Sequence, residues 1–280
     1  MSVDIVGSVV LITGASGGLG TGLSLELARH GARLALVARR QEPLDTLADR
    51  VRGMGANAVA VPGDVTRKAD RRRVIEETER QLGPIDILVN IAGIGRAGPF
   101  VDEDPAPIID LNLLAPIALA REVVGGMVKR GRGQIVSVSS IAALGLPYIV
   151  DYSASKAGLI AFSTGLREEL RGTGVSTTVL LPGFIVDSGI YVAYQTPVPW
   201  YVGSNRTATI SRKAVAAIRS DRPVAVLNQL PARPLLALKV LSENGFRSIV
   251  NTLGLNRYMS AVAAEQLAYD GSRPGTLEER

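Results

Sequence analysis

Short apolar runs alternate with longer amphipathic stretches through most of the chain. The apolar runs have the length of buried strands and lie at Val9–Ile12, Leu34–Ala38, Val59–Val61, Ile87–Val89, Ile135–Val138, Thr177–Leu181 and Val224–Leu227. The stretches of helix length lie at residues 18–30, 41–54, 67–81, 105–130 and 152–172. Continuous apolar strands separated by helices are typical of a parallel sheet covered on both faces. The pattern predicts an α/β fold: a Rossmann-like, doubly wound parallel sheet of about seven strands.

The alternation shows neither an internal repeat nor a low-complexity linker. We therefore expect one domain over residues 1–270, in which residues 184–260 form a substrate lid and a C-terminal helical extension. A polar, poorly ordered tail is expected at residues 271–280.

Composition narrows the chemistry further. The 280 residues include no cysteine and one histidine, His30, so disulfides and thiolate or histidine metal sites are not expected. No apolar stretch approaches the length of a membrane span or a signal sequence. We expect a soluble, cytoplasmic protein that could still touch a membrane peripherally.

The net charge is +5, and the densest basic run is RKADRRR at residues 67–73. The acidic run EETE at residues 76–79 follows about one turn later and offsets it. Because interleaved aromatic residues are missing, the run is interpreted as a solvated helix face, and no nucleic-acid partner is expected.

A glycine-rich turn, TGASGGLG, follows the first strand and precedes an amphipathic helix. Gly14, Gly18 and Gly20 have the spacing T-G-x-x-x-G-x-G rather than G-x-G-x-x-G. Glycine permits a sharp turn and a close approach to phosphate, and the helix N-terminus offers free N–H groups. The turn predicts nucleotide binding.

The second strand ends in two arginines, Arg39 and Arg40, with no carboxylate before Glu42. An acidic residue here would bind ribose hydroxyls, whereas a guanidinium suits a 2′-phosphate. The alternative is that both arginines merely begin the next helix. We predict NADP(H) as the cofactor.

Further small polar motifs follow later strands. GDV at residues 63–65 places Asp64 where it could accept a hydrogen bond from the adenine amino group. NIAG at residues 90–93 offers a tight surface for the ribose. Tyr152 and Lys156, four residues apart in YSASK, lie on one face of a predicted helix.

Together with LN at residues 111–112, VSS at 138–140 and PG at 182–183, these motifs resemble the short-chain dehydrogenase/reductase family over residues 7–185. The resemblance implies an NADP(H)-preferring type with an extended C-terminal region and a catalytic tetrad of Asn112, Ser140, Tyr152 and Lys156. The cofactor-binding residues it implies are Gly14, Ser16, Gly18, Leu19, Gly20, Arg39, Arg40, Asp64, Val65, Asn90, Ala92, Gly93, Tyr152, Lys156, Pro182, Gly183 and Ile185.

The chain departs from the family pattern at three places. Ile91 replaces the second asparagine of a usual pair. The threonine that usually follows Pro-Gly is absent, which leaves Ser188, or less plausibly Asp187, to take its place. The commoner spacing to the tyrosine would select Ser139 as the catalytic serine, whereas ungapped alignment of the strand selects Ser140, which we prefer.

These residues support acid–base chemistry. A free tyrosine has a pKa of about 10, and a lysine one helical turn away favours the phenolate. Tyr152 would donate or accept the reacting proton, and Ser140 would hydrogen-bond the substrate oxygen. The family resemblance further implies that Lys156 holds the ribose and that Asn112 positions a water. Asp151 is expected to cap the helix or complement its dipole.

The C-terminal third bears on the substrate. Residues 190–201 hold four of the chain's twelve aromatic residues and predict a bulky, hydrophobic substrate. The leucine-rich residues 230–259 could cover the substrate mouth, form a subunit interface or lie on an anionic membrane.

The sequence therefore predicts an oxidoreductase that transfers a hydride between NADP(H) and a hydrophobic ketone, secondary alcohol or aldehyde. The alternatives are a β-ketoacyl thioester reductase, a catalytically silent nucleotide-binding sensor and a lipid-surface scaffold. By resemblance to the family, a homodimer or homotetramer is expected.

Overall fold

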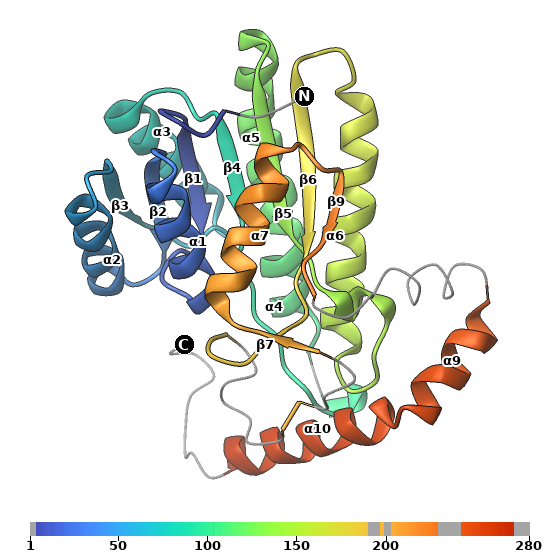
Figure 1. Cartoon of the computed structure of the whole chain (residues 1–280). Coiled ribbons are helices and arrows are strands. Elements are labelled where there is room, and N and C mark those ends of the chain that lie inside the picture. Colours follow the sequence, from blue (N-terminus) through green and yellow to red (C-terminus); the bar gives the residue numbers. More distant parts are fainter. Residues whose placement is uncertain (1–3, 103, 190–196, 199–202, 229–241, 272–280) are drawn as a thin grey trace.

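Seven parallel strands form one sheet in a computed structural model that describes residues 4–102, 104–189, 197–198, 203–228 and 242–271 (Figure 1). The order is β3-β2-β1-β4-β5-β6-β9, which confirms the predicted fold class. The bounds of the strands are β1 Val9–Thr13, β2 Arg33–Ala38, β3 Ala58–Pro62, β4 Ile87–Asn90, β5 Gly133–Val138, β6 Val175–Leu181 and β9 Val224–Val226.

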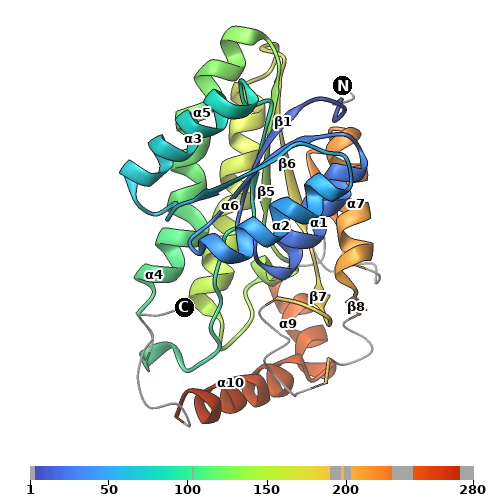
Figure 2. The same cartoon turned by 90° about the vertical axis from the view of Figure 1, so that its left-hand side faces the viewer.

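Helices cover both faces of the sheet, as Figure 2 shows edge-on. One face carries α1 (Gly18–Arg29), α2 (Gln41–Gly53) and α7 (Thr207–Arg219), and the other carries α3 (Lys68–Leu82), α5 (Ala115–Arg130) and α6 (Val150–Glu169). Successive residues of a strand point to opposite faces. Val10 and Ile12 accordingly pack in the core beneath α1, whereas Val9 and Leu11 pack beneath α5. A strand buried on both faces must be apolar throughout, which explains the continuous runs in the sequence.

The order in which successive strands are added to the sheet changes direction between β1 and β4: β2 and β3 are added on one side of β1, and β4 and the later strands on the other. β1 pairs with β2 on one side and with β4 on the other, so the connections on its two sides run away from each other. A crevice opens outside the carboxyl ends of the strands at such a point. The topology therefore fixes where a ligand can enter.

The predicted helix at 105–130 is interrupted. It consists of α4 (Ala106–Ile109), a π-helical turn η2 (Asp110–Leu114) and α5. Contrary to the expectation from sequence, the stretch Ala106–Arg130 is long and apolar enough to cross a membrane by length and composition alone. Leu119 and Met127 pack in the core against the sheet, and Glu122 pairs with Arg71 of α3, with 3.1 Å between Oε1 and Nε. These contacts are those of a core helix.

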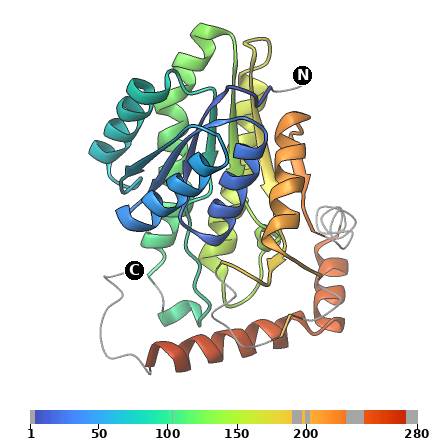
Figure 3. The same ribbon diagram turned by 60° about the vertical axis from the view of Figure 1, so that its left-hand side comes forward.

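A further layer lies below the carboxyl ends of the strands. It contains the short sheet of β7 (Phe184–Ile185) and β8 (Ser204–Asn205), the 3₁₀ turns η1 (Phe100–Asp102) and η3 (Ile141–Leu144), and helices α9 (Glu243–Thr252) and α10 (Leu255–Gly271). Figure 3 shows α10 running across this end of the molecule. The helical extension thus continues past residue 260, where the sequence prediction ended it. Most of the aromatic segment 190–201, and residues 229–241 and 272–280, lie outside the described residues.

Candidate active site

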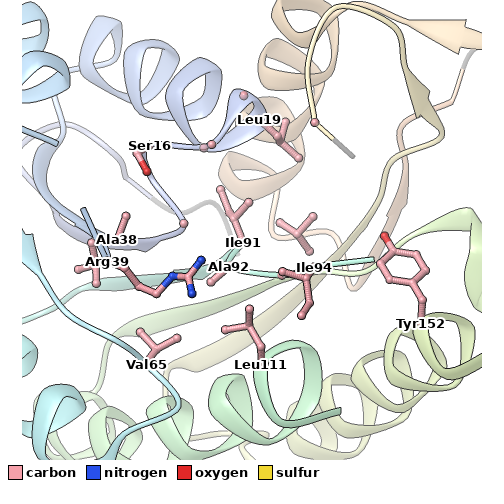
Figure 4. A pocket seen from close by; sticks show the side chains of 18 of the residues that line it. Ser16, Leu19, Ala38, Arg39, Val65, Ile91, Ala92, Ile94, Leu111 and Tyr152 are labelled. Carbon is pink, nitrogen blue, oxygen red and sulfur yellow. The ribbon is translucent and has the colours of Figure 1, made fainter. Parts of the chain in front are cut away.

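A cavity of about 1040 Å³ opens at the carboxyl ends of the strands (Figure 4). Sixteen of the seventeen residues predicted to bind the cofactor line it, and Asn90 is the exception. The lining also holds Ser140 of the predicted tetrad. Arg39 lies at one end of the view and Tyr152 at the other. The sequence motifs therefore meet in one place.

The glycine-rich turn forms one wall of the cavity. Gly14 has φ +68°, and a Cβ there would lie 2.8 Å from the Cα of Ala92. A Cβ on Gly20 would lie 2.1 Å from the carbonyl oxygen of Gly14. Side chains are excluded at both positions, so the backbone itself faces the cavity.

Helix α1 begins at the end of this turn with free donors. Its N-cap residue is Gly17, no described side chain caps it, and no acidic residue occupies its first turn. The first N–H groups of a helix need an acceptor and carry partial positive charge. This wall consequently fits the phosphates of a dinucleotide.

At the far end of the cavity, Arg39 and Arg40 follow β2 directly. The side chain of Arg39 points into the cavity (Figure 4), and neither arginine forms an ion pair with any described residue. Both are exposed. Asp64, on the adjoining wall, accepts hydrogen bonds at Oδ1 from the backbone and hydroxyl of Thr66, at 2.9 and 2.7 Å. Positive charge at this end suits an anionic group of the ligand.

Tyr152 and Lys156 lie one turn apart in α6 at the other end. The lysine Nζ is 5.6 Å from the centre of the tyrosine ring and donates a hydrogen bond to the carbonyl oxygen of Val138 at 3.0 Å. Both side chains are buried, with 8% and 4% of their surface exposed. Tyr152 and Lys156 therefore lie on one face of α6 as predicted, and this face packs at the carboxyl ends of the strands and not towards solvent.

Burial controls the protonation of the pair. It raises the pKa of Tyr152, although a hydrogen bond with Ser140 acts in the opposite direction. Burial also lowers the pKa of Lys156 to about 8. The tyrosine pKa in the chain alone is thus raised and not lowered as expected, because desolvation of the phenolate outweighs the hydrogen bond from Ser140. The tyrosine is a neutral phenol at pH 7, the form that can donate a proton.

The two candidate serines have different surroundings. The Ser139 hydroxyl donates to the carbonyl oxygen of Lys156 at 2.7 Å, and Ser139 is only 2% exposed. Ser140 shares a hydrogen bond with Tyr152, and its Oγ accepts from the backbone N–H of Ala142 at 3.1 Å. Only Ser140 has a hydroxyl paired with the tyrosine among the described side chains.

The two predicted asparagines lie behind the cavity rather than in its lining. Asn112, in the π-helical turn, receives the N–H of Ile94 at 2.9 Å and donates to its carbonyl oxygen at 2.8 Å. These two bonds fix the loop after β4, which forms part of the cavity wall. Asn90 is buried, and its amide atoms find no partner among the described residues. It lies buried at the end of β4, next to the lining residue Ile91.

The segment after β7 brings Ser188 into the lining beside α1, whereas Asp187 accepts hydrogen bonds from Thr207 and caps α7.

Of the two roles expected for Asp151, the structure agrees with dipole complementarity and not with the N-cap. Ile149 is the N-cap of α6, and Asp151 lies in the first turn, accepting the N–H of Tyr152 at 2.7 Å.

Sequence reasoning missed several lining residues: Thr66, Ile91, Ile94, Asp104, Pro107, Asp110 and Leu111. Leu111 belongs to the LN motif and Asp110 precedes it, so both could have been found from that motif.

Hydrophobic side chains from β7 and α10 pack around Tyr152. Tyr152 packs in one cluster with Phe184 and with Tyr258, Met259 and Val262 of α10. The rings of Phe184 and Tyr258 meet edge-on, with their centres 5.8 Å apart.

Comparison with known proteins places this geometry in context. The family model described as short chain dehydrogenase matches residues 8–194. A ketoacyl reductase, HetN, from Nostoc sp. is 34% identical over 242 residues, which cover 85% of this chain and 84% of that protein. An uncharacterized oxidoreductase of Myxococcus xanthus is 37% identical over 87% of this chain and 96% of its own. An 11-beta-hydroxysteroid dehydrogenase-like protein of Arabidopsis thaliana is 41% identical over 66% of this chain and 63% of its own.

Two solved structures share the fold. A short chain dehydrogenase/reductase from Burkholderia phymatum in complex with NAD superposes with a TM-score of 0.77 at 22% identity, over 86% of this chain and 95% of its own. A variant of actinorhodin polyketide ketoreductase with NADPH gives 0.72 at 23% identity, over 83% and 98%.

Proposed function

The chain belongs to the short-chain dehydrogenase/reductase family and is an NAD(P)-dependent oxidoreductase, and from this premise we propose that it reduces hydrophobic carbonyl compounds with NADP(H). The observation that carries the proposal is the group of buried Tyr152 and Lys156 with half-buried Ser140 at one end of a cavity whose other end holds arginines that form no ion pair with a described residue. The reverse reaction, oxidation of a secondary alcohol, uses the same residues.

The cavity fits the cofactor on its own geometry. The glycine wall would hold the two phosphates against the N–H groups of α1, and Arg39 would bind a phosphate on the adenosine ribose. Lys156, 3.4 Å from where a Cβ on Gly93 would lie, is placed to donate to the second ribose. The bound cofactor supplies or accepts the hydride.

The protein's own contribution is proton transfer and charge stabilisation. The neutral phenol of Tyr152 would donate its proton to the carbonyl oxygen as that oxygen gains negative charge. Ser140, hydrogen-bonded to the same hydroxyl, would donate to the substrate oxygen and hold it in line. The cationic form of Lys156 would stabilise the phenolate that results. The Ser139 hydroxyl donates to the carbonyl oxygen of Lys156 instead, which supports Ser140 over Ser139 in this role.

The substrate class follows from the tyrosine end. Ile94 and Leu111 line the cavity between Arg39 and Tyr152 (Figure 4), and the residues clustered with Tyr152 are hydrophobic. Each buried CH₂ contributes roughly 0.8 kcal/mol to binding. A ketone or aldehyde with a bulky apolar body is thus favoured over a small polar one.

The test compares NADPH with NADH oxidation for a series of ketones and aldehydes graded in apolar size. We expect kcat/KM to rise with apolar bulk and to favour NADPH. Arg39→Ala should lower that preference by roughly 10- to 100-fold, the worth of a charge-assisted hydrogen bond. Arg52→Ala, an exposed arginine of α2 paired with Asp49 outside the cavity, is the matched control. NADH preference in the unmodified protein would refute the role of Arg39 alone.

A β-ketoacyl thioester reductase is the second candidate, because one relative at 34% identity is named a ketoacyl reductase. The same assay separates the two when a short β-ketoacyl thioester is added to the series. Higher kcat/KM for that thioester than for every simple ketone would favour the second candidate. The proton-transfer roles of Tyr152 and Ser140 are common to both.

A further inference from the structure

A buried arginine of α3 contacts the loop that follows β3. Arg71 is 8% exposed and is the only arginine buried among the described residues. Its Nη1 donates to the carbonyl oxygens of Val65 and Thr66 at 2.9 and 3.0 Å, and its Nε donates to Oε1 of Glu122 on α5 at 3.1 Å. The basic run at residues 67–73 was predicted to be a solvated helix face, and Arg71 departs from that prediction.

The contacts of Arg71 explain why a charge can lie here. Removing a guanidinium from water is unfavourable unless its donors find acceptors. Its planar fork can bind a carboxylate on one side and backbone carbonyl groups on another, which the single ammonium of a lysine cannot do in the same geometry. An apolar side chain could fill much of the same space without losing hydration. The polar contacts to the loop and to Glu122 are therefore what an arginine adds at this position.

Neighbouring side chains of α3 hold the same loop. Oδ2 of Asp70 accepts the backbone N–H of Asp64 at 2.8 Å, and Nη2 of Arg73 donates to the carbonyl oxygen of Pro62 at 2.6 Å. Arg73 is exposed and Asp70 is half-buried, so water competes for their bonds, whereas the bonds of Arg71 are largely shielded. The contacts of Arg71 are consequently the ones that water replaces least well.

The loop forms part of the cavity wall. Residues 63–66 all line the cavity, and Figure 4 shows Val65 on the side of Arg39, away from Tyr152. With its carbonyl oxygen held by Arg71, Val65 presents its apolar side chain to the cavity. Arg71 is not among the lining residues, so it can act on a ligand only through the backbone that it holds.

We propose that Arg71, paired with Glu122, is a positioning residue that holds the loop at residues 63–66 against the adenosine half of the cofactor. The proposal rests on the proposed function, which places the adenosine at the Arg39 end of the cavity. A flat adenine ring binds more tightly to a surface that is already in place, because ordering a loop on binding lowers affinity. Loss of the Arg71 contacts should therefore weaken binding of the adenosine half and leave the chemistry at Tyr152 unchanged.

The experiment measures the two halves of the cofactor separately. Calorimetry gives the dissociation constant and the stoichiometry for NADPH and for ADP, which contains the adenosine but no nicotinamide. The rate of hydride transfer to an apolar ketone is measured in a single turnover at saturating NADPH. The variants are Arg71→Met, Arg71→Lys, Glu122→Leu and Glu122→Gln. Arg80→Met, at an exposed arginine of the same helix that pairs with Glu77, is the matched control.

We expect Arg71→Met to weaken binding of NADPH and ADP by the same factor, about 10-fold, the worth of one hydrogen bond to a charged group. Hydride transfer at saturating NADPH should stay within about twofold of the unmodified rate. Arg71→Lys and Glu122→Leu should show intermediate losses of affinity. Glu122→Gln keeps an oxygen for the Nε of Arg71 and should bind ADP within about twofold of the unmodified protein. Arg80→Met should leave all three quantities unchanged.

Four outcomes would contradict these expectations. Unchanged ADP affinity in Arg71→Met, with only the stoichiometry lowered, would overturn the proposal, because the arginine would then serve folding alone. A fall in the hydride-transfer rate as large as the fall in affinity would also overturn it, since the disturbance would extend to Tyr152. If Arg71→Met does not fold, equal ADP affinities of Glu122→Leu and Glu122→Gln would overturn it. Failure of the unmodified protein to bind both NADPH and ADP would instead refute the proposed function.

Discussion

Lys156 and Tyr152 show how strongly burial affects the protonation of a side chain. The lysine Nζ donates to the carbonyl oxygen of Val138, and both side chains have almost no contact with solvent. Desolvation disfavours the charged form of each, so it lowers the lysine pKa and raises that of the tyrosine. At pH 7 the tyrosine is therefore a neutral phenol, and the lysine, with a pKa of about 8, is still mostly cationic. A bound substrate whose carbonyl oxygen gains negative charge would take the proton from the Tyr152 hydroxyl.

The lowered pKa of Lys156 predicts a particular dependence of stability on pH. The unfolded chain holds this proton up to a pKa near 10.5, whereas the folded chain releases it near 8. Between these values the unfolded state binds more protons, so folding stability rises with pH. From pH 8 to pH 10 we expect the contribution of this residue to increase the free energy of unfolding by ~2 kcal/mol.

Urea denaturation of the ligand-free protein at pH 8, 9 and 10 measures this contribution as the difference between the unmodified protein and Lys156→Met. The rise should be absent from Lys156→Met and present in Lys129→Met, an exposed lysine at the end of α5. A parallel pH dependence in the unmodified protein and Lys156→Met would show that the lysine titrates normally.

For single residues, the sequence was enough to predict where Tyr152 and Lys156 lie, but not their protonation. The four-residue spacing in YSASK was enough to place Tyr152 and Lys156 on one face of a helix. The sign of the tyrosine shift depends on burial that only the packed structure reveals. The choice between Ser139 and Ser140 likewise rests on which hydroxyl the Lys156 carbonyl accepts from, a contact across 17 residues.

Among the elements, the buried strands were the most predictable because their apolar runs are set by burial on both faces. The π-helical turn at Asp110–Leu114 was not predictable from helix propensity. It coincides with the two hydrogen bonds that join Asn112 to the backbone of Ile94, and such turns are frequent at functional sites. The full length of α10 was also missed, because its apolar face is defined by a cluster assembled from distant segments.

Helix α10 is predicted to support the substrate end of the cavity and not the cofactor end. Tyr258→Ala removes a buried ring that packs on Phe184 and should cost about 3 kcal/mol in the free energy of unfolding. We also expect KM for an apolar ketone to rise, while the dissociation constant of NADPH stays within about twofold.

Urea denaturation and steady-state kinetics measure these two effects. Leu267→Ala, at an exposed position of the same helix, should change stability by less than about 0.5 kcal/mol. A larger effect of Tyr258→Ala on NADPH binding than on KM would contradict the assignment of α10 to the substrate end.

The whole molecule places a charged end and an apolar end on one cavity. Reversal of strand order between β1 and β4 opens the crevice, the glycine wall occupies its middle, and Arg39 and Tyr152 mark its limits. The order of strands and motifs in the sequence was enough to predict that these residues line one cavity at the carboxyl ends of the strands. The packing of α10 on the loop after β4 could not be predicted, because it depends on contacts between distant segments, such as the hydrogen bond from the Ala97 N–H to Gln266 Oε1 at 2.6 Å.

The most direct test of the account is the rate of hydride transfer from NADPH to an apolar ketone in Tyr152→Phe, measured in a single turnover beside the dissociation constant of NADPH. We predict a rate at least about 100-fold below that of the unmodified protein, as expected for loss of a general acid, with NADPH affinity changed by less than about threefold. A Tyr152→Phe variant that transfers hydride at the unmodified rate would contradict the central role given to this tyrosine.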